Sequence, residues 1–146
     1  YATDYAPGSK EVLKLATRLA RAEEATLLIA HVTLLEKYPV GELFDEEPPR
    51  DPKEWDKLRS VIPPDPGVPF EHRLLYGEPG TADVTRPADE IMKLAKEEDV
   101  EMIVVGTHGR SGLGRLMGSV AETLIRHAPC AVVSVKLPEH AEETVE

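Results

Sequence analysis

The sequence predicts one α/β domain, in which helices cover both faces of an open parallel sheet. Short, almost wholly apolar runs alternate along the chain with segments whose apolar residues recur at helical spacing. The length of 146 residues is that of a single domain, and a composition of 41% hydrophobic and 30% charged residues is ordinary for a globular protein. We find no internal repeat and no low-complexity tract, so residues 1–146 are expected to form one domain.

Five stretches are expected to be strands of this sheet. Ala25–Val32 is apolar nearly throughout, as expected for a strand that is buried on both faces of a parallel sheet, and Val100–Val105 and Ala131–Val135 have the same character. Phe70–Tyr76 alternates more and carries charged residues, which places it at a sheet edge. Tyr1–Thr3 is interpreted as the end of a first strand whose beginning is missing, since the chain starts without methionine.

Helix start signals precede four segments that lie between the expected strands. Serine or aspartate can cap a helix by accepting a backbone N–H, and proline is tolerated in a first turn because its missing N–H has no intrahelical partner there. A serine followed three residues later by glutamate forms a capping box. These signals are Ser9, Asp51-Pro52, Pro87, and Ser119 with Glu122.

The stretches outside these elements differ in composition. Residues 33–69 hold eight of the thirteen prolines and an acidic run, which predicts a long irregular crossover, with a specific binding loop as the alternative. Residues 137–146 form an acidic tail.

Charge and cysteine content exclude several classes of function. The formal net charge of −10 repels phosphate backbones and anionic lipid, so neither nucleic acid nor a membrane is an expected partner. The single cysteine, Cys130, allows no intrachain disulfide and suits a reducing compartment, and with no signal peptide recognised the expected location is cytoplasmic. The histidines are not at metal-ligand spacing with one another or with Cys130, so no metal site is expected.

The most informative segment is a glycine-rich stretch from Gly106 to Ser119, between an expected strand and the last expected helix. It contains five of the ten glycines. Glycine reaches positive φ at little cost and lets a ligand approach the backbone closely. From Gly106 to His127 the charges balance to +2, and a helix start favours an anion. The segment predicts a phosphate or nucleotide site; the alternative is a plain strand-to-helix turn.

Several positions match the pattern of a known family. In that pattern G-x-x-G, nine residues and then G-[ST] follow the fourth strand, while T-D ends the first strand and H-V ends the second. The matching residues here are Gly106, Gly109, Gly118, Ser119, Thr3-Asp4 and His31-Val32. The chain therefore resembles the ATP-binding type of the universal stress protein family over essentially its whole length, most weakly between Thr33 and Pro69.

The resemblance implies a Rossmann-like fold, similar to the adenine nucleotide alpha hydrolases, with five parallel strands in the order 3-2-1-4-5 and a ligand where that order reverses. It implies ATP with Mg²⁺ carried on the phosphates, and no catalytic residue. Ala2, Thr3, Asp4 and Val32 would line the adenine end, and Gly106 would approach the ribose. The residues expected near the phosphates are His108, Gly109, Arg110, Gly118, Ser119 and Val120. Asp4 has an alternative role as a turn residue before the first helix.

Two departures from the family pattern leave its function open. Only eight residues separate Gly109 from Gly118, and a loop, Gly80–Pro87, intervenes where a typical member has none. This loop is an inert insertion, a lid or a partner surface. The resemblance implies a nucleotide-responsive stress or signalling module that forms a homodimer through Ala131–Val135, a strand expected at a sheet edge, and acts on an unknown protein partner. The alternatives are a slow Mg²⁺-dependent ATP hydrolase and a dimeric interaction module that binds no nucleotide.

Overall fold

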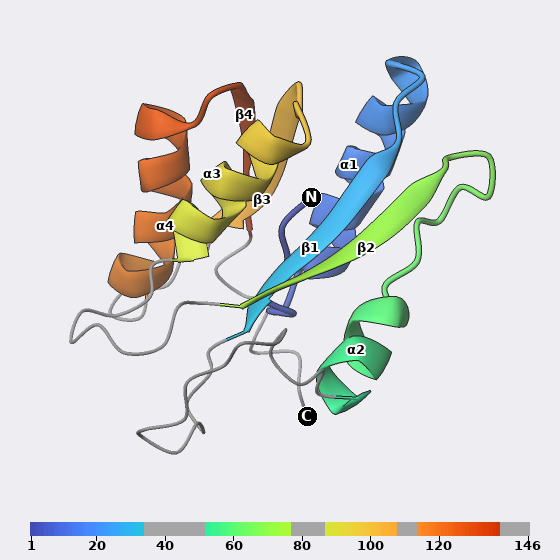
Figure 1. The fold of residues 1–146 in the computed structure, drawn as a ribbon, viewed down its shortest axis with the longest axis horizontal. Coiled ribbons are helices and arrows are strands. Elements are labelled where there is room, and N and C mark those ends of the chain that lie inside the picture. Colours follow the sequence, from blue (N-terminus) through green and yellow to red (C-terminus); the bar gives the residue numbers. More distant parts are fainter. Residues whose placement is uncertain (34–51, 77–86, 108–113, 138–146) are drawn as a thin grey trace.

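The structure, a computed structural model, describes residues 1–33, 52–76, 87–107 and 114–137, and only the backbone of residues 114–119. Within these ranges helices and strands alternate as predicted (Figure 1). The elements are α1 (Ser9–Ala22), β1 (Leu27–Thr33), α2 (Pro52–Arg59), β2 (Phe70–Tyr76), α3 (Pro87–Glu97), β3 (Met102–Thr107), α4 (Gly114–His127) and β4 (Ala131–Lys136). The predicted α/β class with parallel strands is confirmed. The stretch 34–51, the Gly80–Arg86 part of the intervening loop, and residues 138–146 of the tail lie outside the described residues.

The strands form two parallel pairs. β1 pairs with β2 in a register that runs from Leu27 opposite Phe70 to Thr33 opposite Tyr76. β3 pairs with β4 from Met102 opposite Ala131 to Thr107 opposite Lys136. Since each pair is parallel, its two strands end at the same edge, and loops that carry function gather at such carboxyl edges.

The first three residues lie between the two pairs and bond to both. Ala2 forms a parallel bridge with Ala30 of β1. Thr3 N–H donates to Ala30 O at 2.8 Å, and Ala30 N–H donates to the carbonyl of Tyr1 at 2.9 Å. On the other side, Ala2 N–H donates to Val104 O of β3 at 3.2 Å. This short segment is the backbone connection between β1 and β3.

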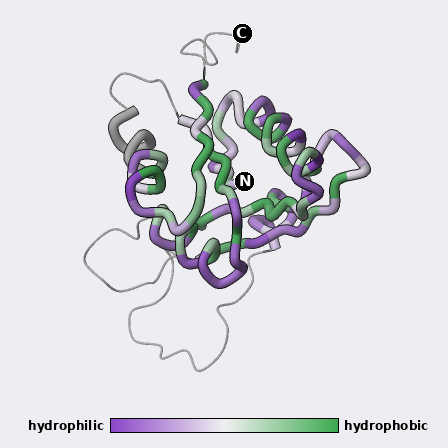
Figure 2. Tube along the Cα trace, turned by 90° about the horizontal axis from the view of Figure 1, so that it is seen from above, coloured by the Kyte–Doolittle hydropathy of each residue, from purple (hydrophilic) through white to green (hydrophobic). Residues whose placement is uncertain are grey.

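Two cores lie on opposite sides of the strands. Because successive side chains of a strand alternate in direction, Ile29 and Val104 face one core and Ile103 and Val105 face the other. The first core takes its helical side chains from α1 and α2, for example the fully buried Leu58. The second takes them from α3 and α4, for example the fully buried Leu124. Figure 2 shows hydrophobic colour along the strands and on the helix faces that meet them.

Two helix starts differ from the sequence prediction. Gly8 is the N-cap of α1, with φ of 87° and no side-chain cap, and Ser9 is the first helical residue. Gly8 holds that place because its backbone is left-handed and a Cβ there would come within 3.0 Å of Leu137 Cδ2. Helix α4 begins at Gly114, so the predicted cap Ser119 lies within the helix. Arg115, Leu116 and Met117 are good helix formers, and the helix extends through them toward the strand despite Gly118.

The C-terminal turn of α1 contains a residue in a left-handed conformation. Ala25 N–H donates to Ala20 O at 2.8 Å, which closes the turn in the way typical of a left-handed helix cap. Glu24 occupies that left-handed position with φ of 52°, where glycine is usual. Its side chain is exposed, so little contact depends on it.

We expect Glu24→Gly to raise the free energy of unfolding by about 1 kcal/mol, because glycine adopts this φ without steric cost. Urea denaturation measures the change. The matched control is Glu23→Gly, one residue earlier, where φ is −90° and glycine brings only extra freedom to the unfolded chain. Equal effects of the two substitutions would show that the left-handed turn stores no strain.

Candidate functional site

Three of the predicted site residues pack against the same core cluster. Ala2 of the N-terminal segment, Val32 near the end of β1 and Val120 of α4 all pack against the second core cluster. These residues are far apart in the sequence and belong to three different elements. Two of the predicted adenine-end positions and one of the predicted phosphate-end positions thus contribute to the same core, which also includes Val100 just before β3.

Thr3 and Asp4 continue the N-terminal segment into a tight turn. Thr3 is buried at 7% exposure, and its Oγ1 accepts from Tyr5 N–H at 3.0 Å. Asp4 is exposed, and its Oδ1 accepts from Ala6 N–H at 3.0 Å. Asp4 thus has the local turn role that the sequence left open, in which a carboxylate stabilises the chain reversal before a helix.

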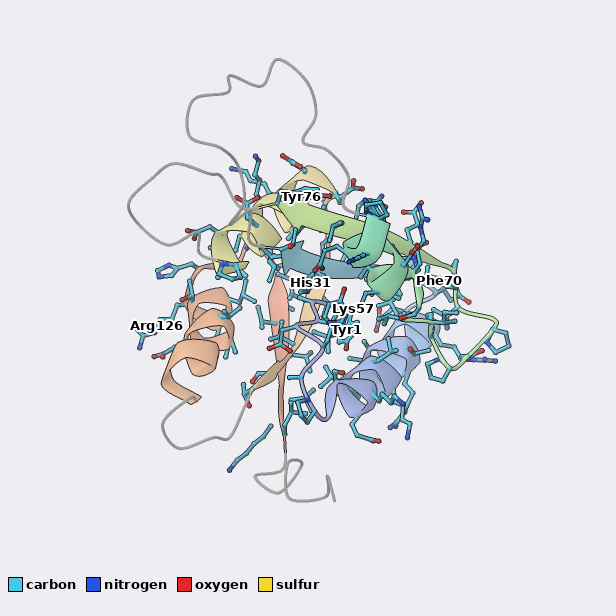
Figure 3. All side chains as sticks on the ribbon, turned by 90° about the horizontal axis from the view of Figure 1, so that it is seen from below. Tyr1, His31, Lys57, Phe70, Tyr76 and Arg126 are labelled. Carbon is cyan, nitrogen blue, oxygen red and sulfur yellow. The ribbon has the colours of Figure 1, made fainter. Side chains whose placement is uncertain are left out.

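A polar and aromatic cluster that sequence reasoning did not anticipate lies beside this turn. His31 Nδ1 is 2.7 Å from Thr3 O and donates a hydrogen bond to it, since a carbonyl only accepts. The His31 ring lies 4.4 Å from the Tyr5 ring, and its Nε2 lies 3.7 Å from Glu54 Oε2 of α2. The Lys57 ammonium lies 4.3 Å from the Tyr5 ring centre, a cation–π contact. Figure 3 labels His31 on β1 and Lys57 on α2, the two elements that contribute them to this cluster.

Burial shapes the chemistry of this cluster. It raises the pKa of the Tyr5 hydroxyl to about 12, with smaller contributions from the Glu54 and Tyr1 charges, so Tyr5 stays protonated at neutral pH. The Tyr5 hydroxyl has no hydrogen-bond partner in the part of the chain that the structure describes. Only His31 of this cluster carried a sequence signal, as part of the His31-Val32 match. Tyr5 and Glu54 are brought to it by the turn and by the packing of α2.

Gly106 lies at the end of β3 with a structural reason to lack a side chain. A Cβ at this position would come within 3.1 Å of Val12 Cγ2 and 3.2 Å of Leu137 Cδ1. The missing side chain thus permits the close approach of α1 to β3, on the side of the first core. The expected approach of Gly106 to a ribose is a separate role that this packing does not require.

The remaining predicted residues fall in or near α4. His108, Gly109 and Arg110 lie outside the described residues. Gly118 and Ser119 are the fifth and sixth residues of α4 rather than its start. An α-helix leaves only the N–H groups of its N-cap and first three residues without an intrahelical partner, so among the described residues the free donors at this helix start belong to residues 114–116.

The described residues contain neither a group of metal ligands nor a membrane-spanning helix. In the described ranges no three histidine, cysteine or acidic side chains are grouped as metal ligands. Among the same residues no helix is both long and apolar enough to cross a bilayer.

Comparison with known proteins decides the family. The family model described as the universal stress protein family matches residues 1–136. The chain belongs to the universal stress protein family. The family predicted from the sequence motifs is thereby confirmed.

Relatives and solved structures agree with this assignment. Universal stress protein MJ0531 of Methanocaldococcus jannaschii is 30% identical, over 94% of this chain and 80% of its own. A universal stress protein of Thermus aquaticus, from the 3′ region of the QAH/OAS sulfhydrylase, is 33% identical over 92% and 95%. Three solved structures, at identities that speak for the fold alone, are similar. The protein MJ0577 has a TM-score of 0.65 and 21% identity, and the match covers 94% of both chains. A universal stress protein in complex with cAMP has a TM-score of 0.60 and 23% identity, and the match covers 94% of both chains. An Arabidopsis thaliana member with AMP bound has a TM-score of 0.50 and 17% identity, and the match covers 99% of this chain and 87% of that one.

The packing role of Gly106 is testable by itself. We expect Gly106→Ala to lower the free energy of unfolding by about 1–3 kcal/mol, because the new methyl overpacks the contact with Val12 and Leu137. Thermal and urea unfolding measure the loss. Val12→Ala removes one of the two crowding groups. The double variant Gly106→Ala with Val12→Ala should therefore lose less free energy of unfolding than the two single variants together. Strict additivity would contradict the close approach of α1.

Proposed function

We propose that this universal stress protein binds an adenine nucleotide, ATP, at the carboxyl edge of its central strands and acts as a nucleotide-responsive stress or signalling module. The observation that carries the proposal is the position of the Thr3–Asp4 turn beside the carboxyl-terminal part of β1, where the Thr3 carbonyl lies 2.7 Å from His31 Nδ1. Two family members of similar fold support it, since one is described in complex with cAMP and another with AMP bound.

The proposed roles follow the order of elements along this edge. Ala2, Thr3, Asp4 and Val32 line the adenine end, and the exposed Asp4 carboxylate offers acceptor oxygens to a ribose or base. Gly106 approaches the ribose. Backbone N–H groups of the glycine-rich stretch hold the phosphates, with His108, Gly109 and Arg110 beside them, and the positive end of the α4 dipole favours their charge.

The second glycine imposes a condition on this site. Gly118, Ser119 and Val120 donate to phosphate only if their N–H groups are not used inside α4, which begins at Gly114 in this structure. We therefore propose that the nucleotide-bound form starts α4 at Gly118, with residues 114–117 leaving the helix to close over the phosphates.

The proposed site lacks the parts of an efficient phosphotransferase. Mg²⁺ enters on the phosphate oxygens and waters, since it commonly needs few protein carboxylates there. Fast hydrolysis would require a positioned base and compensation of the γ-phosphate charge, and no lysine lies in the glycine-rich stretch. The module therefore works through binding, and slow Mg²⁺-dependent hydrolysis is the enzymatic alternative.

The proposal predicts a difference between two glycines. We expect Gly118→Val to weaken ATP binding about a hundredfold, because a side chain there blocks two or more charge-assisted N–H contacts of roughly 1.5–3 kcal/mol each. The matched control, Gly114→Val, should bind within a few-fold of the parent. Titration calorimetry with Mg²⁺–ATP gives the affinities, and circular dichroism confirms that both variants fold.

Other outcomes separate the rival functions. A loss only in Gly114→Val would place the phosphates at the α4 start seen here and overturn the assignment of Gly118. If the parent protein binds ATP with a Kd in the millimolar range or weaker, the dimeric interaction module without nucleotide is favoured. The early start of α4 supports the same alternative. Inorganic phosphate released from ATP with added Mg²⁺ would identify the slow hydrolase.

We further propose that the full chain forms one cytoplasmic domain with a five-stranded sheet in the order 3-2-1-4-5, and that two copies pair through β4. The hydrogen bonds of residues 1–3 to both strand pairs support this order. In the described residues β4 pairs only with β3, and Ile125 of the neighbouring α4 is 57% exposed. An unpaired edge beside exposed apolar surface suits a second copy.

The dimer proposal predicts that Ser134→Pro dissociates the protein to a 16.1 kDa species in sedimentation at micromolar concentration. Leu137 N–H donates toward β3, so by alternation the N–H of Ser134 points to the free edge, and proline removes it. Ser134→Ala keeps the N–H and should remain dimeric. A folded Ser134→Pro dimer, or a monomeric parent, would overturn the pairing through β4.

A further inference from the structure

Tyr5 has a backbone conformation that is unusual for its side chain. Within the described ranges three residues other than glycine have positive φ: Tyr5 at 60°, Glu24 at 52° and Asp99 at 51°. Glu24 and Asp99 lie just after the ends of α1 and α3, where a left-handed residue commonly closes a helix. Tyr5 instead lies in the turn before α1, and a bulky side chain in this region of φ is sterically strained. Such strain persists only where the surrounding contacts hold the residue in place.

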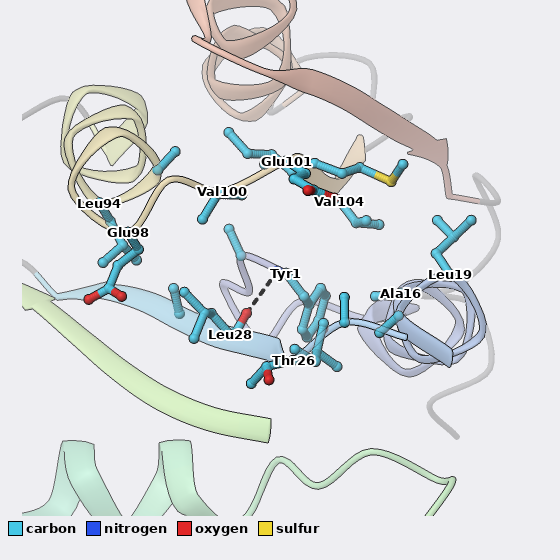
Figure 4. Close-up of a pocket in the computed structure, with 18 of the residues that line it drawn as sticks. Tyr1, Ala16, Leu19, Thr26, Leu28, Leu94, Glu98, Val100, Glu101 and Val104 are labelled. Carbon is cyan, nitrogen blue, oxygen red and sulfur yellow. Dashed lines mark hydrogen bonds between the residues drawn. The ribbon is translucent and has the colours of Figure 1, made fainter. Parts of the chain in front are cut away.

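The chain on either side of this turn is fixed by bonds that do not involve α2. Before the turn, the Tyr1 nitrogen donates to Leu28 O at 2.9 Å, the dashed line in Figure 4, and Thr3 N–H donates to β1. After the turn, the Tyr1 hydroxyl donates to Ser9 O at 3.0 Å, at the start of α1. Residues 4–8, between these anchors, are therefore the part whose conformation depends on other contacts.

The conformation of Tyr5 sets the direction of the Asp4 carboxylate. Asp4 Oδ1 accepts from Ala6 N–H at 3.0 Å. Because Ala6 directly follows Tyr5 in the chain, a change of φ at Tyr5 moves this donor away from the carboxylate. The left-handed form of Tyr5 is thus a condition for the observed orientation of Asp4.

Contacts from two other elements hold the Tyr5 ring. The His31 ring of β1 lies 4.4 Å from it, and Lys57 Nζ of α2 lies 4.3 Å from its centre. His31 is itself fixed at the start of the turn, since its Nδ1 donates to Thr3 O at 2.7 Å. Lys57 is exposed and belongs to a helix whose apolar anchor is the fully buried Leu58. Lys57 thus joins α2 directly to the residue on which the turn depends.

The size of this contact is enough to change the population of the turn. A cation–π contact at an exposed site corresponds to about a two- to fivefold shift of an equilibrium. The strain at Tyr5 brings the alternative conformations of the turn closer in free energy, so a shift of this size changes the fraction of protein that has the left-handed turn. A ligand that binds one conformation alone has an apparent affinity proportional to that fraction.

We propose that α2 regulates the proposed nucleotide site through Tyr5, which acts as a positioning residue for the Asp4 carboxylate. When Lys57 lies over the Tyr5 ring, the turn presents Asp4 to the nucleotide; displacement of α2 releases the turn and lowers the affinity. By linkage, a bound nucleotide that fixes the turn also strengthens the hold on α2. This inference rests on the proposed nucleotide function, and hydrogen exchange at the turn tests the coupling without nucleotide.

The test replaces Lys57 with methionine, which removes the charge and keeps an unbranched side chain. We expect Lys57→Met to bind Mg²⁺–ATP about twofold more weakly in titration calorimetry and to exchange the Ala6 amide hydrogen about twofold faster without nucleotide. The reason is that a shift of about fourfold in one equilibrium divides between the fractions that have and lack the turn. The matched control is Arg59→Met on the same helix, which removes the same charge and a cation–π contact of 5.2 Å to Trp55, and it should change neither value. Lys57→Arg keeps a cation over the ring and should retain both parental values.

A second background separates action through Tyr5 from a general effect of charge. Tyr5→Gly adopts the same φ without steric cost and removes the ring. In that background Lys57→Met should leave both the ATP affinity and the Ala6 exchange rate unchanged. Equal effects of Lys57→Met with and without the ring, equal effects of Lys57→Met and Arg59→Met, or no effect of Lys57→Met would each overturn the positioning role.

Two outcomes distinguish this regulation from the proposed function itself. Faster exchange at Ala6 in Lys57→Met, with an unchanged ATP affinity, would overturn the regulation and leave the nucleotide site in place. A parent protein that does not bind ATP would overturn the proposed function and the regulation together. In that case the exchange rates would still decide whether α2 holds the turn.

Discussion

The structure depends on three residues that hydrogen bond on both sides. Tyr1–Thr3 join the β1–β2 pair to the β3–β4 pair through backbone bonds to Ala30 and Val104. Each pair alone is a two-stranded ribbon, which is marginal in water, and only their connection gives a sheet with two covered sides. The same segment leads directly into α1, whose first residue Ser9 accepts a hydrogen bond from the Tyr1 hydroxyl at 3.0 Å.

Close packing around this segment gives Gly8 and Gly106 a reason to be glycine that does not depend on ligand binding. Gly8 and Gly106 both face Leu137, and Gly106 also faces Val12 of α1. Any side chain at either position would push α1 away from β3 or displace Leu137. A glycine at the end of a strand can therefore serve the core and a ligand at once, and the core requirement exists whether or not a nucleotide binds.

Much of the fold was predictable because apolar runs in the sequence indicate which strands are buried in the sheet. The strand Phe70–Tyr76 has the predicted bounds, and β1, β3 and β4 end within two residues of the predicted ends. Helix starts were less predictable. Ser9 has the right chemistry for a cap, yet the chain direction at Gly8 needs positive φ, and only the packing against Leu137 reveals this. The start of α4 at Gly114 shows that local helix propensity competes with the capping signal at Ser119.

The site was only partly predictable because its polar neighbours meet through tertiary packing. In the sequence His31 and Glu54 are separated by the first part of the proline-rich crossover 33–69, and no spacing rule links them. His31 holds Thr3 through one ring nitrogen and faces Glu54 with the other, so α2 is coupled to the turn that presents Asp4. The turn is thus fixed from two directions, by β1 and β3 through the backbone and by α2 through His31.

The carboxyl end of the N-terminal segment links this connection to the candidate site. Thr3 is buried and bonded to β1, and Asp4 lies in the turn that leads to the start of α1. The backbone bonds that join the two strand pairs therefore also fix the position of the Asp4 turn. A change that breaks the bonds of Ala2 and Thr3 to Val104 and Ala30 acts on the sheet and on this turn together.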